Sequence, residues 1–241
     1  MKKIFAGILF FSLMLCGTAF AAEQSVTDYL NSITNGPSAY TQLEESPTET
    51  DAYWAVTGSG QSAATMIVEF AGNANTNSFG IFDRQDDTNT VQIFSGPQGA
   101  GSKATISVYN NGIVTVNDIL AGHFASGNDF GFYMGTASYG NFFSDSTLNA
   151  DMGYDHMWTY VGTDTSDITL PGQYGSTTGT WTDEEYVLAW EDVPYSSCDG
   201  DHNDMMVMVE SVHPVPEPGT LMLLGSGLVG LAFYRRRRKQ A

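Results

Sequence analysis

The chain has 241 residues, of which 42% are hydrophobic, so it is long and apolar enough for one domain with a sizeable core. Its 27 acidic residues outnumber nine lysines and arginines, and seven of those cations lie at residues 2–3 and 235–239. Only Arg84 and Lys103 remain in between, where the charge is 2 - 27 = -25. This charge excludes binding to nucleic acid phosphates; it either attracts divalent cations or serves solubility alone.

The first part of the chain, residues 1–21, has the organisation of a secretory signal peptide. A lysine pair is followed by an apolar run over residues 4–15 and by a small-x-small site at residues 19–21. We therefore predict export through the Sec translocon and cleavage after Ala21. A leucine precedes Cys16 where a lipoprotein needs a small residue, which disfavours lipidation. Cleavage would leave Cys198 as the only mature cysteine, so the exported domain must fold without an intrachain disulfide.

Short strand-like runs fill the chain after residue 53, whereas residues 22–52 form a polar leader in which residues 26–33 favour a helix. The runs alternate apolar with polar residues and are punctuated by Gly, Asn and Asp, as in antiparallel sheets. Asn110-Asn111-Gly112 predicts a hairpin turn. This texture favours a single all-β domain, an antiparallel β-sandwich or jelly roll, over residues 53–214. The expected strands are 65–70, 79–82, 90–94, 103–109, 113–116, 130–134, 156–161, 186–190 and 205–210.

The segment from Val215 to Ala241 falls into three parts. It begins with a stiff, extended tetrapeptide, because each proline fixes its own φ and restricts the residue before it. Residues 220–234 are uncharged, and we interpret them as a transmembrane helix, although 15 helical residues rise only about 22 Å against about 30 Å of hydrocarbon. A basic block then predicts a cytoplasmic end. The tetrapeptide is Val215, Pro216, Glu217 and Pro218, and the block is Arg235, Arg236, Arg237, Arg238 and Lys239.

This order of Pro216-Glu217-Pro218, apolar segment and terminal arginines resembles the PEP-CTERM sorting signal of Gram-negative bacteria. The resemblance implies that the chain is anchored in the inner membrane and then processed near the motif by an exosortase, a membrane-embedded transpeptidase-like protease. It further implies release to the cell surface or the surrounding polymer, in association with exopolysaccharide or biofilm. An ordinary C-terminal anchor with a proline-rich stalk is the alternative interpretation.

A second resemblance rests on segments spread from about residue 60 to residue 212, most distinctively the acidic and aromatic segments 190–192 and 201–204. Together they resemble secreted bacterial domains of unknown function of the DUF4114 type. The resemblance implies a β-rich extracellular module and no established chemistry. The other matching segments are 71–74, 77–83, 91–94, 149–151, 155–157, 188–189 and 200.

The densest group of possible metal ligands lies between residues 191 and 204. Asp199, Asp201 and Asn203 repeat at every second residue, which suits oxygen ligands around a hard cation such as calcium. An EF-hand is disfavoured, because Asp204 stands where the loop needs glycine and a strand follows. A solvated acidic turn that caps its own backbone remains the alternative. The candidate calcium ligands are Glu191, Asp192, Asp199, Asp201, Asn203 and Asp204.

Other groups give weaker indications of chemistry, and we expect no enzyme activity. His156 and His202 lack the spacing of a zinc site. A glycosidase needs two carboxylates at a defined distance across the sugar, and the sequence does not show whether the acids at residues 183–185 lie at that distance. No serine or cysteine lies in a nucleophile-elbow motif. The alternatives to a structural surface protein are a carbohydrate- or calcium-binding module and, last, a polysaccharide hydrolase. Candidates for stacking on sugar rings are Trp54, Trp158, Trp181 and Tyr174.

Overall fold

The computed structural model describes residues 24–43, 51–57, 62–69, 76–215 and 235, with the backbone alone for residues 66–69. The predicted signal peptide and the predicted span over residues 220–234 lie outside these ranges. Within them, no helix is both long and apolar enough to cross a membrane. The described chain is mostly antiparallel β-structure, so the all-β prediction is confirmed.

The described part of the chain contains one α-helix, one 3-10 turn and sixteen strands. They are α1 (Val26–Ile33), β1 (Tyr40–Gln42), β2 (Trp54–Val56), β3 (Ser62–Glu69), β4 (Ser78–Asp83), β5 (Asp86–Phe94), β6 (Lys103–Val108), β7 (Ile113–Val116), β8 (Ile119–His123), β9 (Asp129–Thr136), β10 (Gly140–Phe143), the 3-10 turn η1 (Ser146–Leu148), β11 (Met157–Gly162), β12 (Asp167–Leu170), β13 (Thr177–Thr180), β14 (Glu185–Trp190), β15 (Met205–Glu210) and β16 (Val212–Pro214).

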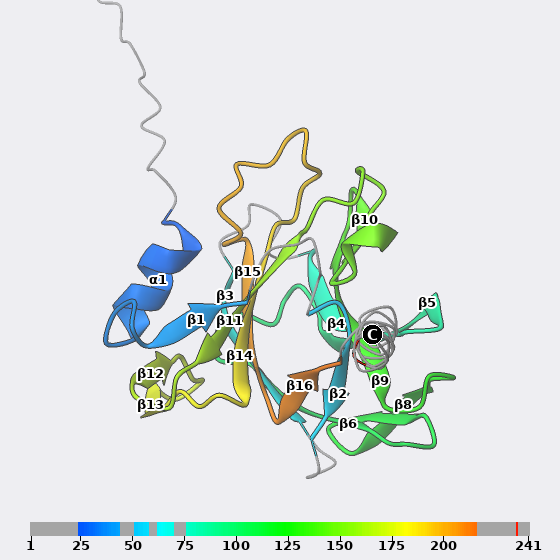
Figure 1. The fold of residues 1–241 in the computed structure, drawn as a ribbon, viewed down its shortest axis with the longest axis horizontal. Coiled ribbons are helices and arrows are strands. Elements are labelled where there is room, and N and C mark those ends of the chain that lie inside the picture. The colour runs from blue at the N-terminus through cyan, green and yellow to red at the C-terminus, as the bar shows by residue number, and fades with distance from the viewer. Residues whose placement is uncertain (1–23, 44–50, 58–61, 70–75, 216–234, 236–241) are drawn as a thin grey trace, which may run out of the picture.

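Two large sheets form the sandwich (Figure 1). One has eight strands in the order β1-β11-β14-β15-β3-β6-β7-β8. The other has six, in the order β16-β2-β9-β4-β5, with β10 paired to β9. A separate hairpin, β12-β13, lies beside α1 and the first sheet. The order places sequence-distant strands next to each other, as in the predicted sandwich.

The core between the sheets is rich in aromatic side chains. Trp54 from β2 meets Tyr186 from β14 edge to face at 4.9 Å between ring centroids, and this contact joins the two sheets. Phe79 from β4 likewise meets Trp190 from β14. Such pairs contribute about 0.5–1.5 kcal/mol beyond the area they bury. Strand β15 adds Met205, Val207 and Val209 to this core. Both β14 and β15, which are joined by the loop over residues 191–204, therefore contribute to the main core.

A second hydrophobic cluster covers the outer face of the same two strands. Val187 and Ala189 of β14 pack there with Val26 and Leu30 of α1. Both faces of β14 are thus buried, which explains why its sequence is apolar without alternation. The helix predicted over residues 26–33 is confirmed, and the side chain of Ser25 caps it by accepting a hydrogen bond from the N–H of Asp28.

Every predicted strand has an observed counterpart, with differences at the ends. The hairpin of β6 and β7 is confirmed. The turn between β4 and β5 is confined to Arg84 and Gln85: Asp83 pairs with Asp86 and accepts a hydrogen bond from the N–H of Gln85. Residues 40–42, expected to be leader loop, form β1 and pair with β11. Strands β2, β8, β10, β12, β13 and β16 were not expected, because they are short and lack clear alternation.

Candidate metal centre

The loop that carries the predicted ligands joins β14 to β15 and projects at one end of the sandwich (gold in Figure 1). Glu191 follows the last residue of β14, and its N–H donates to the backbone oxygen of His156 at 3.0 Å. Asp204 precedes β15, and its N–H donates to the backbone oxygen of Trp190 at 3.1 Å. The paired strands therefore bring the two ends of this loop together.

The interior of the loop is held by side-chain hydrogen bonds to its own backbone. Asp201 accepts from the N–H of Asn203 at 3.3 Å and from its Nδ2 at 2.7 Å. The Nδ2 of Asn203 also donates to the backbone oxygen of Gln24 at 2.6 Å, which ties the loop to the start of the described chain. His202 between them has a φ of 51°, and Gly200 one of 75°. Both residues have backbone angles in the left-handed region, so the chain changes direction on each side of Asp201.

Three carboxylates converge at the base of the loop. One oxygen from each of Glu191, Asp199 and Asp201 lies within 4.8 Å of the other two. Calcium binds oxygen at 2.3–2.6 Å, so two oxygens on opposite sides of one ion are separated by about 5 Å. The three side chains therefore have the spacing that a single ion requires.

Glu191 is buried, whereas Asp201 is half-buried and Asp199 is exposed, so the group lies at the surface with one carboxylate inside. Glu191 is 1% exposed, and its Oε2 is buried with no hydrogen-bond partner. Asn203 is fully buried, and its Oδ1 is also without a partner. An unpaired polar oxygen is costly to bury unless it is neutralised or bonded. Two orphan oxygen acceptors beside converging carboxylates are the arrangement that a hard cation satisfies.

The electrostatics of the loop lead to the same conclusion. Burial, followed by repulsion from Asp204, Asp199 and Asp201, raises the pKa of Glu191 to about 8. Burial also raises the pKa of Asp204 to about 7. A hydrogen bond from the N–H of Asp192 lowers this pKa, whereas repulsion from the carboxylate of Asp192 and from other loop carboxylates raises it. Negative charge is therefore disfavoured here without a positive ion, and a divalent cation reverses that balance.

The six candidate ligands divide into two groups by what they contact. Glu191, Asp199 and Asp201 converge, with Asn203 hydrogen-bonded to Asp201. Asp204 contacts the side chain of Glu191 and also accepts from the N–H of Asp192 at 2.8 Å, while Asp192 accepts from the Nδ2 of Asn77 at 2.9 Å. The last two carboxylates thus hold the loop, and the ligand set stays a prediction.

Asp151 and His156 are close in the sequence, but sequence reasoning missed the contact that His156 makes with Glu191. His156 is fully buried and stacks on Phe142, with ring centroids 3.7 Å apart. Its Nδ1 lies 2.9 Å from the backbone oxygen of Glu191 and its Nε2 lies 2.9 Å from a carboxylate oxygen of Asp151. No spacing rule links His156 to Glu191, because the contact crosses from the start of β11 to the end of β14.

The candidate histidines and the carboxylates of residues 183–185 do not belong to this group of carboxylates. His202 contacts the backbone oxygen of Asp155 through Nε2 and stacks on Trp158, so it does not meet His156 in a zinc site. In the part of the chain that the structure describes, the only group of three or more potential ligands is the one at Glu191, and it holds no histidine. The carboxylate of Glu185 accepts from the N–H of Thr182 at 2.7 Å and closes a turn.

Three of the four aromatic candidates for sugar stacking pack against other side chains of the protein. Trp54 and Trp181 are fully buried, so they fill the core, as aromatic residues usually do, and do not stack on a ligand. Trp158 packs against His202 at 3.9 Å between ring centroids. Tyr174 is 96% exposed and remains available.

Comparison with protein families gives two matches. Residues 99–212 match the domain of unknown function DUF4114, and residues 214–239 match the PEP-CTERM protein-sorting motif. The candidate calcium ligands lie inside the DUF4114 match. Strands β4 and β5 belong to the same sandwich but precede the matched residues. No curated protein and no solved structure matches the chain. The chain thus carries a PEP-CTERM sorting motif, the motif of exported proteins sorted by exosortase, next to a segment that matches DUF4114.

Proposed function

We propose that this protein is a non-enzymatic module of the cell surface or extracellular matrix, whose acidic loop is closed by a calcium ion bound to Glu191, Asp199 and Asp201. The observation that carries the proposal is the buried Glu191 carboxylate, which has one oxygen without a partner and two further carboxylates within reach of one ion. The ion neutralises the loop and fixes it to the ends of β14 and β15.

Calcium fits this site better than other biological cations. All the donors are oxygens, so soft or imidazole-preferring metals such as zinc are disfavoured. The ligands come from a long loop that adjusts more readily to the irregular shell of calcium than to the strict octahedron of magnesium. Extracellular calcium modules have dissociation constants of about 10⁻⁴ to 10⁻³ M.

The proposed partner outside the cell is exopolysaccharide, and the proposed role is mechanical and adhesive. Three observations support it: the sorting motif, the β-sandwich scaffold, and the engagement in a turn of Glu185, one of the carboxylates considered for a glycosidase. A carboxylate that closes a turn is not free to act as a general acid or base.

Thermal unfolding of the full chain in detergent tests the calcium site. Because the ion binds the native state alone, calcium at a hundredfold excess over its dissociation constant stabilises by about 2.7 kcal/mol. We expect calcium, and not magnesium, to raise the melting temperature. The pair Asp199→Asn and Asp201→Asn should remove that increase, while Asp183→Asn with Glu184→Gln, which removes the same charge from an exposed turn, should keep it. Equal responses to the two ions, or an unchanged response in the ligand variant, would show that no calcium site exists.

A further inference from the structure

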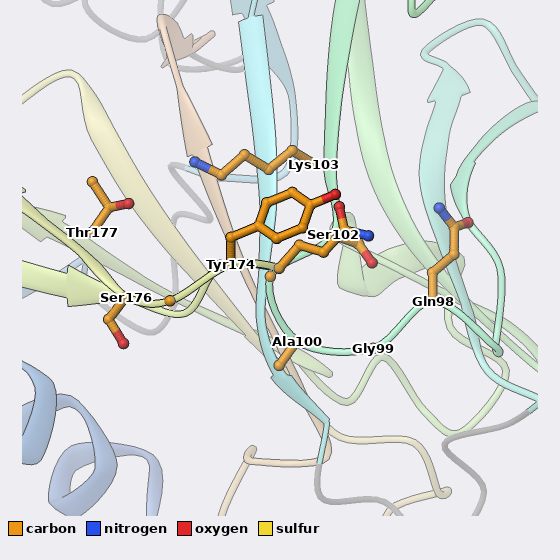
Figure 2. A pocket seen from close by; sticks show the side chains of 12 residues that line it. Gln98, Gly99, Ala100, Ser102, Lys103, Tyr174, Ser176 and Thr177 are labelled. Atoms are coloured by element: carbon orange, nitrogen blue, oxygen red, sulfur yellow. The ribbon is translucent and has the colours of Figure 1, made fainter.

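A cavity of about 760 Å³ lies away from the acidic loop, between the β5–β6 connection and the β12–β13 connection (Figure 2). This size falls within the range of about 300–1,000 Å³ for small-ligand sites. Its lining comes from two segments that are far apart in the sequence, residues 98–103 and 172–177.

The two walls of the cavity are fixed against each other. Gly101 has a φ of 84°, and a Cβ on it would lie 2.8 Å from the Cα of Gly172. Only glycine permits this backbone-to-backbone approach. Each wall is also a hydrogen-bonded turn, from the N–H of Ser102 to the oxygen of Gly99 and from the N–H of Gly175 to the oxygen of Gly172, both at 3.1 Å. The cavity is therefore formed before any ligand arrives.

The lining has a chemistry that differs from the rest of the molecule. None of its twelve residues is acidic, in a chain with 27 acidic residues. It contains one cation, Lys103, and otherwise glycines, one alanine, one tyrosine and uncharged polar side chains. The uncharged polar side chains are Gln98, Ser102, Gln173, Ser176 and Thr177.

Tyr174 supplies the one large apolar surface. Figure 2 shows its ring projecting across the cavity, in view between Lys103 and Ser102. The ring is almost fully exposed and lies in a turn flanked by glycines, so its position is not explained by packing into a core. An exposed aromatic face surrounded by hydroxyl and amide groups matches a ligand that has an apolar face and a rim of hydroxyls.

We propose that this cavity binds a carbohydrate, with the Tyr174 ring stacked on the C–H face of a pyranose and the polar side chains bonded to its hydroxyls. An apolar partner is disfavoured because the lining is mostly polar. Lys103 supplies local positive charge for a hydroxyl or, in an acidic sugar, for a uronate carboxylate. The proposal deepens the proposed association with exopolysaccharide and uses none of the calcium ligands.

Isothermal titration of the full chain in a sugar-free detergent tests the proposal with two sets of probes. The first set is neutral cello-, xylo- and chito-oligosaccharides, and the second is oligogalacturonate. We expect binding to at least one set, weakened about tenfold or more by Tyr174→Ala through loss of the stacking contact and retained by Tyr174→Phe. Lys103→Gln should weaken oligogalacturonate selectively. Tyr139→Ala, a matched control at another exposed tyrosine, should have no effect.

The result that overturns the proposal is the absence of binding to either set, or equal affinities for the parent and Tyr174→Ala. The calcium-dependent melting shift is measured on the same variants. Because Tyr174 is not among the proposed calcium ligands, that shift should persist in Tyr174→Ala. Failure of the carbohydrate site is therefore distinguishable from failure of the calcium site.

Discussion

His156 and Glu191 bond to each other twice: the N–H of Glu191 donates to the backbone oxygen of His156 at 3.0 Å, and the Nδ1 of His156 lies 2.9 Å from the backbone oxygen of Glu191. A carbonyl oxygen only accepts, so Nδ1 carries a proton. The Nε2 faces the carboxylate of Asp151, and burial would raise the pKa of that carboxyl, but hydrogen bonds from Tyr195 N–H and from His156 outweigh it and lower the pKa. The ring of His156 therefore lies between two acceptors, the Glu191 carbonyl at Nδ1 and the Asp151 carboxylate at Nε2.

The first prediction concerns this buried pair. His156→Ala removes a hydrogen-bond partner from the Asp151 carboxylate and from the Glu191 carbonyl, and a buried acceptor left unpaired costs about 1–3 kcal/mol. We expect the free energy of unfolding to fall by about that amount in urea denaturation. His123→Ala, at an exposed strand position, is the control and should be near neutral. Equal stability of His156→Ala and the parent would contradict a stabilising role for these buried hydrogen bonds.

The second prediction tests whether Glu191 binds calcium or only contributes to the stability of the fold. Glu191→Gln keeps the shape of a side chain that is 1% exposed and removes its charge. Because burial and neighbouring carboxylates already disfavour that charge, stability without calcium should not fall. The calcium-specific melting shift should disappear, because the amide offers calcium a neutral oxygen in place of a carboxylate. A variant that keeps the full calcium response would remove Glu191 from the ligand set.

The third prediction is a pH effect at Glu210, which pairs directly across β14 and β15 with Glu185. Burial, and after it repulsion from Glu185, raises the pKa of Glu210, whereas the positive charge of Lys103 lowers it by a smaller amount. The native state thus keeps a proton that the unfolded chain has lost, so this stabilisation is complete below the unfolded pKa and lost as pH rises through the native pKa.

Replacing Glu210 with Gln should therefore stabilise the protein near neutral pH and have little effect in acid. Like charges directly opposite across strands destabilise by about 0.2–1 kcal/mol, which sets the expected gain. Urea denaturation at both pH values measures it, with the exposed substitution Glu184→Gln as the control. A gain of the same size in acid would point to packing as its cause.

The fourth prediction concerns sorting. The PEP-CTERM match spans residues 214–239, and its motif is Pro216-Glu217-Pro218. Pro216→Ala with Glu217→Ala should block processing and retain the protein in the inner membrane of its host. Cell fractionation with mass spectrometry of the C-terminus measures this. Arrival of the double variant at the surface with normal length and yield would show that the segment acts only as an anchor.

Local pattern was sufficient for several elements of the fold. Strands β6 and β7 and the turn between them follow from alternation and from Asn110-Asn111-Gly112, because a hairpin is closed by neighbouring residues. Strand β1 was not predictable in this way. It has three residues, and it exists because β11, more than a hundred residues later, supplies its hydrogen-bond partners. A short segment whose partner is distant carries little signal of its own.

The sequence by itself determined the sorting motif and the all-β class, because a motif is read from residue order and a strand from its own alternation. Only the tertiary structure decided which acids of the 191–204 loop converge, since pairing of β14 with β15 sets the distance between Glu191 and Asp201. It also decided that Trp54 is core and Tyr174 is exposed, because burial depends on which strand or turn a residue occupies and on what packs against it.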